Sequence, residues 1–230
     1  MKYVIASAFL LAAMAPQRMK ADTVSQRLQR AATIVKQIMA TPEKAIPKDL
    51  LNKAVCVAVV PGFKKAAFGI GGAFGRGALV CRRGGTGAWG APSMFTLTGP
   101  SIGFQIGVQS TDLVLVVMNP NGARKLLQSR VKLGADATAA AGPVGRSSEA
   151  ATDAQMHAEI LTYSRSHWLF AGISLEGDLV KPDNGSNHQL YGREIEAKDI
   201  LFTNAVGVPA AARALDAALT RYSPRGGQKF

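Results

Sequence analysis

The sequence predicts an α+β, β-rich single domain, in which a strongly bent or barrel-like, mainly antiparallel sheet is flanked by N- and C-terminal helices. Charged residues make up 18% of the 230 residues and hydrophobic residues 47%, with 24 glycines, which suits strands joined by tight turns and excludes general disorder. Apolar residues alternate with period two through the middle of the chain, whereas amphipathic helical spacing occurs towards its ends. The chain has no evident linker or internal repeat, so we predict one domain.

The first residues have the pattern of a secretory signal. Lys2 precedes a continuous apolar stretch from Tyr3 to Ala15, which is too short for an ordinary membrane span. Pro16 disfavours cleavage directly after this stretch, so an uncleaved N-terminal anchor is the alternative. We expect residues 1–21 to direct export of a domain that spans residues 22–230.

Residues 22–40 are predicted to form an amphipathic helix that begins at Asp22 or Thr23. Its apolar positions recur at spacings of four and three: Val24, Leu28, Ala31, Val35 and Ile38. It carries three basic residues: Arg27, Arg30 and Lys36. Two interpretations are open, a helix packed on the body of the domain or a helix that lies on an anionic membrane surface.

The middle of the chain predicts a series of strands joined by short turns, as in an antiparallel meander. The strand-like runs are Ala54–Val60, Phe68–Arg82, Trp89–Leu97, Ile102–Gln109 and Leu113–Met118. Residues 131–142 alternate and are predicted to be extended, and residues 160–167 and 169–180 are predicted to be a last strand pair. Short helices are expected over residues 123–129, 194–201 and 209–222.

One face of the strand predicted at residues 68–82 is almost bare. Gly69, Gly71, Ala73, Gly75 and Gly77 share this face. Four glycines inside a strand cost about 2–4 kcal/mol relative to alanine, so we expect another strand or a ligand to approach this backbone closely. The spacing fits neither a dinucleotide fingerprint nor a P-loop, which disfavours nucleotide binding. Similar small faces at residues 103–107 and 134–142 favour close strand packing in a bent sheet.

Small and polar faces also suggest a shallow site for a lipid headgroup or an ion. Its predicted lining consists of Gln105, Asp136, Thr138, Ser174 and Glu176. An envelope protein that binds a ligand or Ca²⁺ there is the alternative function. The chain has no loop with regular Ca²⁺-ligand spacing, so neither a metal nor another cofactor is predicted.

Catalytic motifs are absent from the sequence. None of the three histidines lies in an HExxH motif, and there is no G-x-S-x-G nucleophile elbow. We therefore predict that the protein is not an enzyme, with a hydrolase that uses Asp136, His157 or Ser174 as the alternative.

The two cysteines, Cys56 and Cys81, both lie in apolar strand-like runs. They can form one disulfide in an oxidising compartment or remain two buried free thiols. Without a CxxC pair, the sequence predicts neither a redox motif nor a zinc site.

The chain is basic, with a net charge of +12. Removing the three basic residues of the first 21 leaves 24 basic against 15 acidic residues, a net charge of +9. Three basic pairs lie at predicted strand ends or turns: Lys64-Lys65, Arg82-Arg83 and Arg124-Lys125. This excess favours an anionic membrane as the partner, and the lack of interleaved aromatic residues disfavours nucleic acid.

Several long stretches together resemble the SYLF domain, a family of lipid-binding domains. They are FGIGGAFGRGALVCRR, GAWGAPSMFTLTGPSIGFQIGVQSTDLVLVVMN, LGADATAAAGPVGR and YSRSHWLFAGISLEGDLV, followed by Asn187 and Tyr191-Gly192. The resemblance runs from about Thr23 to Leu201 and implies a non-enzymatic bacterial member, located in the periplasm or at the cell-envelope membrane. His167-Trp168 departs from the pattern, since a basic residue and a glycine are expected there.

In eukaryotic relatives the SYLF domain is linked to phosphoinositide binding through an N-terminal amphipathic helix, and some relatives bind actin. The resemblance implies that Arg27, Arg30 and Lys36 contact lipid here. We therefore expect an exported phospholipid-binding protein, for phosphoinositide-type or other anionic headgroups. Its expected lipid-binding residues are Arg27, Arg30, Lys36, Lys64, Lys65, Arg82 and Arg83.

Overall fold

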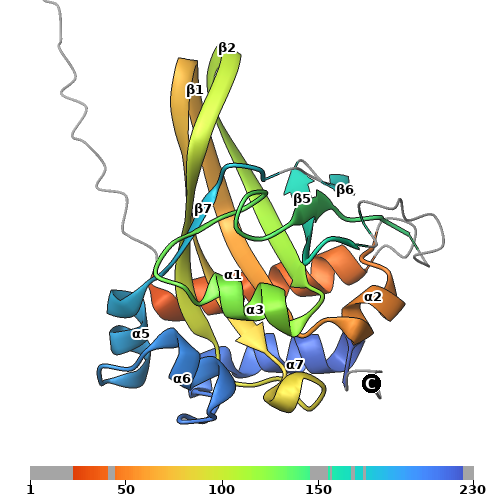
Figure 1. Cartoon of the computed structure of the whole chain (residues 1–230), viewed down its shortest axis with the longest axis vertical. Coiled ribbons are helices and arrows are strands. Elements are labelled where there is room, and N and C mark those ends of the chain that lie inside the picture. The colour runs from red at the N-terminus through yellow and green to blue at the C-terminus, as the bar shows by residue number, and fades with distance from the viewer. Residues whose placement is uncertain are drawn as a thin grey trace, which may run out of the picture.

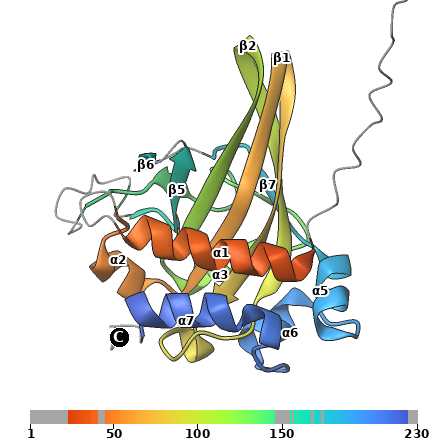
Figure 2. The same cartoon turned by 180° about the vertical axis from the view of Figure 1, so that it is seen from behind.

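The computed structural model describes residues 23–40, 45–145, 155, 157–166, 169–172 and 175–224, with the backbone alone at 67–69, 101–108, 166 and 169–172. The expected signal segment lies outside these residues. The described chain forms a curled, mainly antiparallel sheet of seven strands with helices packed against it, which confirms the predicted α+β class (Figures 1 and 2). No described helix is long and apolar enough to cross a membrane.

The elements follow one another along the chain in this order: α1 (Val24–Met39), α2 (Lys48–Lys53), β1 (Cys56–Cys81), η1 (Arg83–Gly85), β2 (Ser93–Val117), α3 (Pro120–Leu126), β3 (Val131–Lys132), β4 (Ala139–Ala141), β5 (Ile160–Ser166), β6 (Leu169–Gly172), β7 (Leu179–Pro182), α5 (Asn184–Tyr191), α6 (Ala197–Phe202), η2 (Ala210–Ala212) and α7 (Arg213–Tyr222).

Strands β1 and β2 form one long two-stranded ribbon that is bent double. They stay paired from Cys56 opposite Val117 to Leu79 opposite Ser93. Yet the two ends of β1 meet, because Cys56 and Cys81 form a disulfide with their Cα atoms 4.0 Å apart. The ribbon therefore folds back near the middle of β1, and its bend projects beyond the rest of the sheet (Figure 1).

The expected meander of five short strands is wrong, because the predicted turns pair as parts of the ribbon. Gly62, with a φ of +60°, lies in a register shift between Val60 and Phe63 rather than in a turn that ends the strand. Gly99 and Pro100 likewise pair with Ala73 and Gly72. A β-bulge bends a ladder without ending it, and glycine supplies the left-handed conformation that such a bend requires.

The bare glycine face points into the protein, against the other limb of β1. A Cβ on Gly75 would lie 2.5 Å from Val60 Cγ1 and 2.8 Å from Phe63 Cδ2. A Cβ on Gly77 would lie 2.5 Å from the Val59 carbonyl oxygen. At these two positions close strand packing, not a ligand, explains the glycines.

The ribbon is buried on both faces where it crosses the body. Val57 and Val59 face a core shared with α1 and α7, whereas Ala58 and Val60 face the core inside the curled sheet. Helix α1 begins after a Thr23 capping box and lies between α7 and β1, with its apolar side buried (Figure 2). Of the two interpretations of this helix, the structure therefore has the one packed on the body.

Short strands complete the sheet. β7 and β5 pair with β2, β3 pairs with β7, β6 pairs with β5, and β4 adds to β5 as the only parallel pair among the described strands. The expected strand over residues 131–142 is wrong, since a turn at Gly134 (φ +85°) separates β3 from β4. After β7, α5 begins with its first turn capped by the Asp183 side chain.

Candidate functional site

Arg27, one of the cations predicted to bind lipid, is buried. Its side chain in α1 is 3% exposed, and its Nη1 donates to Ser186 Oγ and lies 4.0 Å from Asp183 Oδ2. Both partners belong to the start of α5. The guanidinium therefore joins α1 to α5 inside the protein, and it presents no charge to a membrane in this structure.

Arg82 is also buried, in a network that closes the base of the ribbon. Its guanidinium stacks 3.9 Å from the centre of the Trp89 ring and donates to the carbonyl oxygens of Ala54, Gly87 and Ser223. The Trp89 indole donates to the same Ser223 oxygen. Burial lowers the pKa of Arg82 to about 10. Arg82 therefore holds the end of α7 against the base of the ribbon.

The exposed predicted cations do not form one patch. Arg30 and Lys36 lie on the outer side of α1, Arg83 follows the base of the ribbon, and Lys64 lies within β1 rather than at a turn. Because Cys81 is bonded to Cys56, Arg83 is separated from Lys64 by about eight strand residues, roughly 26 Å at the usual rise. The pairs Lys64-Lys65 and Arg82-Arg83 therefore lie at different heights along the ribbon.

The ribbon contains almost no acidic residues. From Leu50 to Thr111 the sequence has no Asp or Glu but six Lys or Arg. The composition of the whole chain does not show this local excess of positive charge. Lys64 is exposed and pairs with no carboxylate among the described residues. Arg76, which the sequence analysis left out of the site, is also exposed, with its Nε 3.9 Å from Asp183 Oδ2. The projecting ribbon is thus a cationic element.

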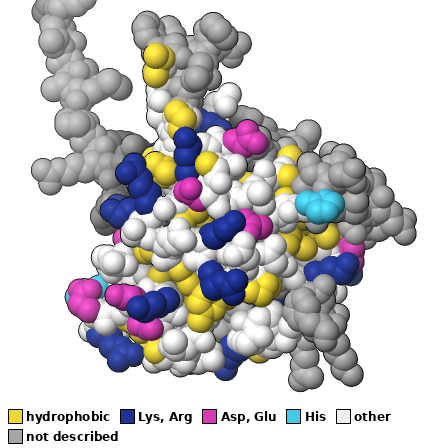
Figure 3. All heavy atoms as spheres, in the orientation of Figure 1, with side chains coloured by type: hydrophobic (Ala, Val, Ile, Leu, Met, Phe, Trp, Pro, Cys, Tyr) yellow, Lys and Arg dark blue, Asp and Glu magenta, His cyan; other side chains and the backbone are white. Residues whose placement is uncertain are grey.

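The bend of this ribbon carries exposed apolar side chains. Ile70 is 84% exposed and Phe74 is 48% exposed, the two highest values among the large hydrophobic residues of the described chain. The Arg76 guanidinium lies 5.8 Å from the centre of the Phe74 ring. Figure 3 shows hydrophobic side chains at the top of the projection with Lys and Arg side chains below them. We call Ile70 and Phe74, with the bend they occupy, the ribbon apex.

Asp136, Thr138 and Glu176, the described side chains of the predicted polar pocket, are exposed. Asp136 is exposed and accepts a hydrogen bond from the Lys132 backbone, closing a local turn. Glu176 is exposed on a neighbouring turn, against Gly134, and the Thr138 hydroxyl accepts from the Glu159 backbone. Ser174 and the side chain of Gln105 lie outside the described residues, and within those residues no group of three or more His, Cys, Asp or Glu could hold a metal.

Glu159 is a buried carboxylate that the sequence analysis did not single out. Its oxygens accept from Lys125 Nζ at 2.8 and 2.9 Å, from the Thr138 backbone at 3.0 Å and from Asn121 Nδ2. Burial alone would raise its pKa, but these hydrogen bonds and the Lys125 charge lower it below the ordinary value. The cluster fixes α3 to the start of β5 and is structural, since Lys125 neutralises the carboxylate.

Asp178 is a second buried carboxylate, located beneath the ribbon. It is 3% exposed, its Oδ2 has no hydrogen-bond partner, and its Oδ1 occupies the place where a Cβ on Gly99 would lie. Burial raises the pKa of Asp178, and the charge of Lys65 opposes this rise. Lys65, half-buried, is the cation that the ribbon brings towards this carboxylate.

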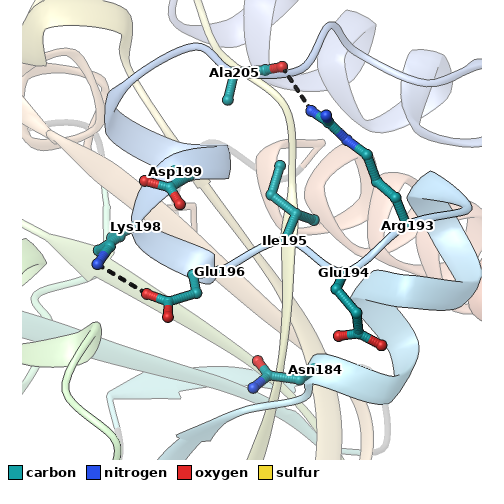
Figure 4. Close-up of a pocket in the computed structure, with 8 residues that line it drawn as sticks. All are labelled: Asn184, Arg193, Glu194, Ile195, Glu196, Lys198, Asp199 and Ala205. Carbon is teal, nitrogen blue, oxygen red and sulfur yellow. Dashed lines mark hydrogen bonds and ion pairs between the residues drawn. The ribbon is translucent and has the colours of Figure 1, made fainter.

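A surface hollow of about 600 Å³ lies between α5 and α6 (Figure 4). Its cations are already engaged, since Lys198 Nζ lies 2.9 Å from Glu196 Oε2 and Arg193 donates to the Ala205 carbonyl oxygen at 3.1 Å. The remaining lining includes Asn184, Glu194, Ile195 and Asp199. The hollow is open, and its lining carries both acidic and basic side chains.

Comparison with known proteins identifies the family. The model of the family described as "Ysc84: Las17-binding protein actin regulator" matches residues 98–222, more than half of the chain. The chain belongs to the Ysc84 family. This confirms the resemblance to the SYLF domain. Among curated relatives, LAS seventeen-binding protein 3 of Saccharomyces cerevisiae is 30% identical over 92% of this chain. SH3 domain-containing YSC84-like protein 1 of Mus musculus is 35% identical over 76% of it.

The match to this Ysc84-family chain covers only part of each relative. It spans 47% of the Saccharomyces protein and 50% of the Mus musculus protein, about half of their lengths. The Ysc84 family match begins at Thr98 in β2 and ends at Tyr222, the last residue of α7. It therefore includes β2 from Thr98 onwards and the helices α3, α5, α6 and α7.

Proposed function

We propose that this protein is an exported, non-enzymatic lipid-binding protein that docks on anionic membrane surfaces of the cell envelope. The observation that carries the proposal is the cationic ribbon, which projects from the body and has no acidic residue from Leu50 to Thr111. Membership of the Ysc84 family and the apolar stretch at residues 3–15 support it further.

The ribbon is better placed for this contact than α1. The apolar side of α1 is buried against β1 and α7, so the helix would have to leave the body before it could lie in a bilayer. Lys64 and Arg76 need no such rearrangement, because both are exposed on the projecting limbs. Each basic residue near an anionic surface contributes about 1 kcal/mol at physiological ionic strength, and these two together about 2 kcal/mol.

Co-sedimentation with vesicles tests the proposal. We expect binding to vesicles of phosphatidylglycerol and phosphatidylcholine, little binding to phosphatidylcholine alone, and weaker binding at high salt. Lys64→Gln combined with Arg76→Gln removes about 2 kcal/mol of attraction and lowers the partition coefficient about 30-fold. The matched control is Arg213→Gln with Arg221→Gln, two exposed cations of α7 remote from the bend. Equal binding to neutral and anionic vesicles would contradict the proposal, as would no binding to either.

A further inference from the structure

The ribbon apex exposes two large apolar side chains to solvent. Ile70 is almost fully exposed and Phe74 is half-exposed, although burying such side chains is strongly favourable in water. Both lie on the face of β1 that points away from the glycine packing, since residues two apart along a strand share a face. They are therefore held outward by the same alternation that turns Gly75 and Gly77 inward.

Exposed cations lie behind this apolar tip, on the limbs of the ribbon and on β7. Arg76 lies two residues beyond Phe74 on the same face, and its guanidinium lies against that ring. Lys64 is exposed on the other limb, and Lys181 is exposed on β7, whose backbone pairs with Thr96 of β2. Among the described carboxylates near these limbs, Asp183 contacts Arg27 and Arg76, and Asp178 is enclosed beneath Gly99. Glu176 is exposed on the turn before β7, where a Cβ on the adjacent Gly177 would lie 4.0 Å from Pro100 of β2. The apolar apex therefore has exposed cations behind it on both limbs of the ribbon.

We infer that the ribbon apex inserts into the acyl-chain boundary of an anionic bilayer, while the cations behind it contact the phosphate headgroups. A bilayer surface offers both matching features, an apolar interior and a negative headgroup layer above it. A second copy of this chain fits less well, since two apices packed together would bring the cations behind each of them closer together. This inference rests on the proposed lipid binding and adds the element that enters the membrane.

Paired variants test insertion separately from electrostatic binding. Ile70→Ser with Phe74→Ser leaves every cation in place, and we expect it to lower partitioning into anionic vesicles between about 10- and 100-fold. The matched control is Phe202→Ser, which removes an exposed phenylalanine (40% exposed) from α6 and is expected to leave binding unchanged. Because all three side chains are exposed, the variants are expected to keep the wild-type circular dichroism spectrum and Tm.

A direct readout of depth completes the experiment. Ile70→Trp is expected to show a blue-shifted emission and quenching by brominated acyl chains on addition of anionic vesicles, relative to the wild type. Phe202→Trp, the control, is expected to show neither change. Wild-type binding with an unchanged Ile70→Ser, Phe74→Ser variant and an unquenched Ile70→Trp would overturn the inference and leave the proposed function standing. A lipid-free oligomer that the double serine variant dissociates would also overturn it, since a second copy would then occupy the apex.

Discussion

The sharpest test of the folded-back ribbon is the substitution of Gly77 by alanine. The added Cβ would lie 2.5 Å from the Val59 carbonyl oxygen and 2.7 Å from the Phe95 ring. Backbone on one side and a buried ring on the other leave no flexible group to move aside. Inserting a methyl group into a packed site typically costs about 1–3 kcal/mol, and we expect the upper end of this range here.

Gly72→Ala is the matched control on the same strand. Its Cβ would meet nothing closer than the Gly99 carbonyl oxygen at 3.9 Å. Alanine in a strand is favoured over glycine by about 0.5–1 kcal/mol, so this variant is expected to be neutral or slightly stabilised.

Thermal unfolding followed by circular dichroism separates the two variants. In a protein of this size 1 kcal/mol corresponds to about 2–4 °C, so Gly77→Ala should lower Tm by about 6–12 °C. Gly72→Ala should leave Tm unchanged or raise it slightly. If both variants unfold at the same temperature, Gly77 does not face the first limb of β1 and the folded-back ribbon is incorrect.

Three further substitutions probe the disulfide and the two buried carboxylates. Replacing Cys56 and Cys81 by alanine opens a crosslink between residues 25 apart, which should lower the unfolding free energy by about 3.5 kcal/mol in urea titrations; an unchanged midpoint would argue against the bond. Asp178→Asn should raise Tm near neutral pH, because burial raises the folded pKa of this carboxyl and its charged form destabilises the fold as pH rises above the ordinary value of about 3.9; a lower Tm at pH 7 would oppose this. Glu159→Gln should do the reverse, since the folded pKa of Glu159 is depressed and its stabilisation is present above about pH 4.3 and lost as pH falls through the folded pKa; equal Tm loss in wild type and variant between pH 6 and 3 would refute this.

Alternation and glycine placement made the sheet predictable, but not the path of its strands. Pro61-Gly62 and Gly99-Pro100 have the composition of turns that end strands. In the structure both stay within the ladder: Gly62 is left-handed and lies in a bulge, whereas Gly99 and Pro100 pair regularly with Ala73 and Gly72. The distinction depends on which strand pairs across the position, and a local pattern does not contain that information.

The candidate site was predictable only in its charge. Lys64 and Lys65 were expected to face a partner and do lie on the projecting ribbon, whereas Arg27 and Arg82 are buried. Arg82 donates to the carbonyl oxygen of Ser223, which is 141 residues away in sequence, so the residues around Arg82 do not predict its burial. Ile70 differs in the opposite sense: an apolar residue in a strand is ordinarily assigned to a core, yet its side chain is exposed. Only the bend of the ribbon places it outside.

The network around Arg82 ties the residue after the last helix to the base of the ribbon. Ser223, just beyond α7, accepts from both Arg82 and Trp89, and its own hydroxyl donates to the Leu51 carbonyl oxygen. A fragment that stopped at Leu201, where the stretches resembling SYLF domains end, would remove these acceptors and uncover the side of α1 that α7 protects. Expression fragments should therefore extend through Ser223. During synthesis, α1 can be fully covered only after α7 has left the ribosome.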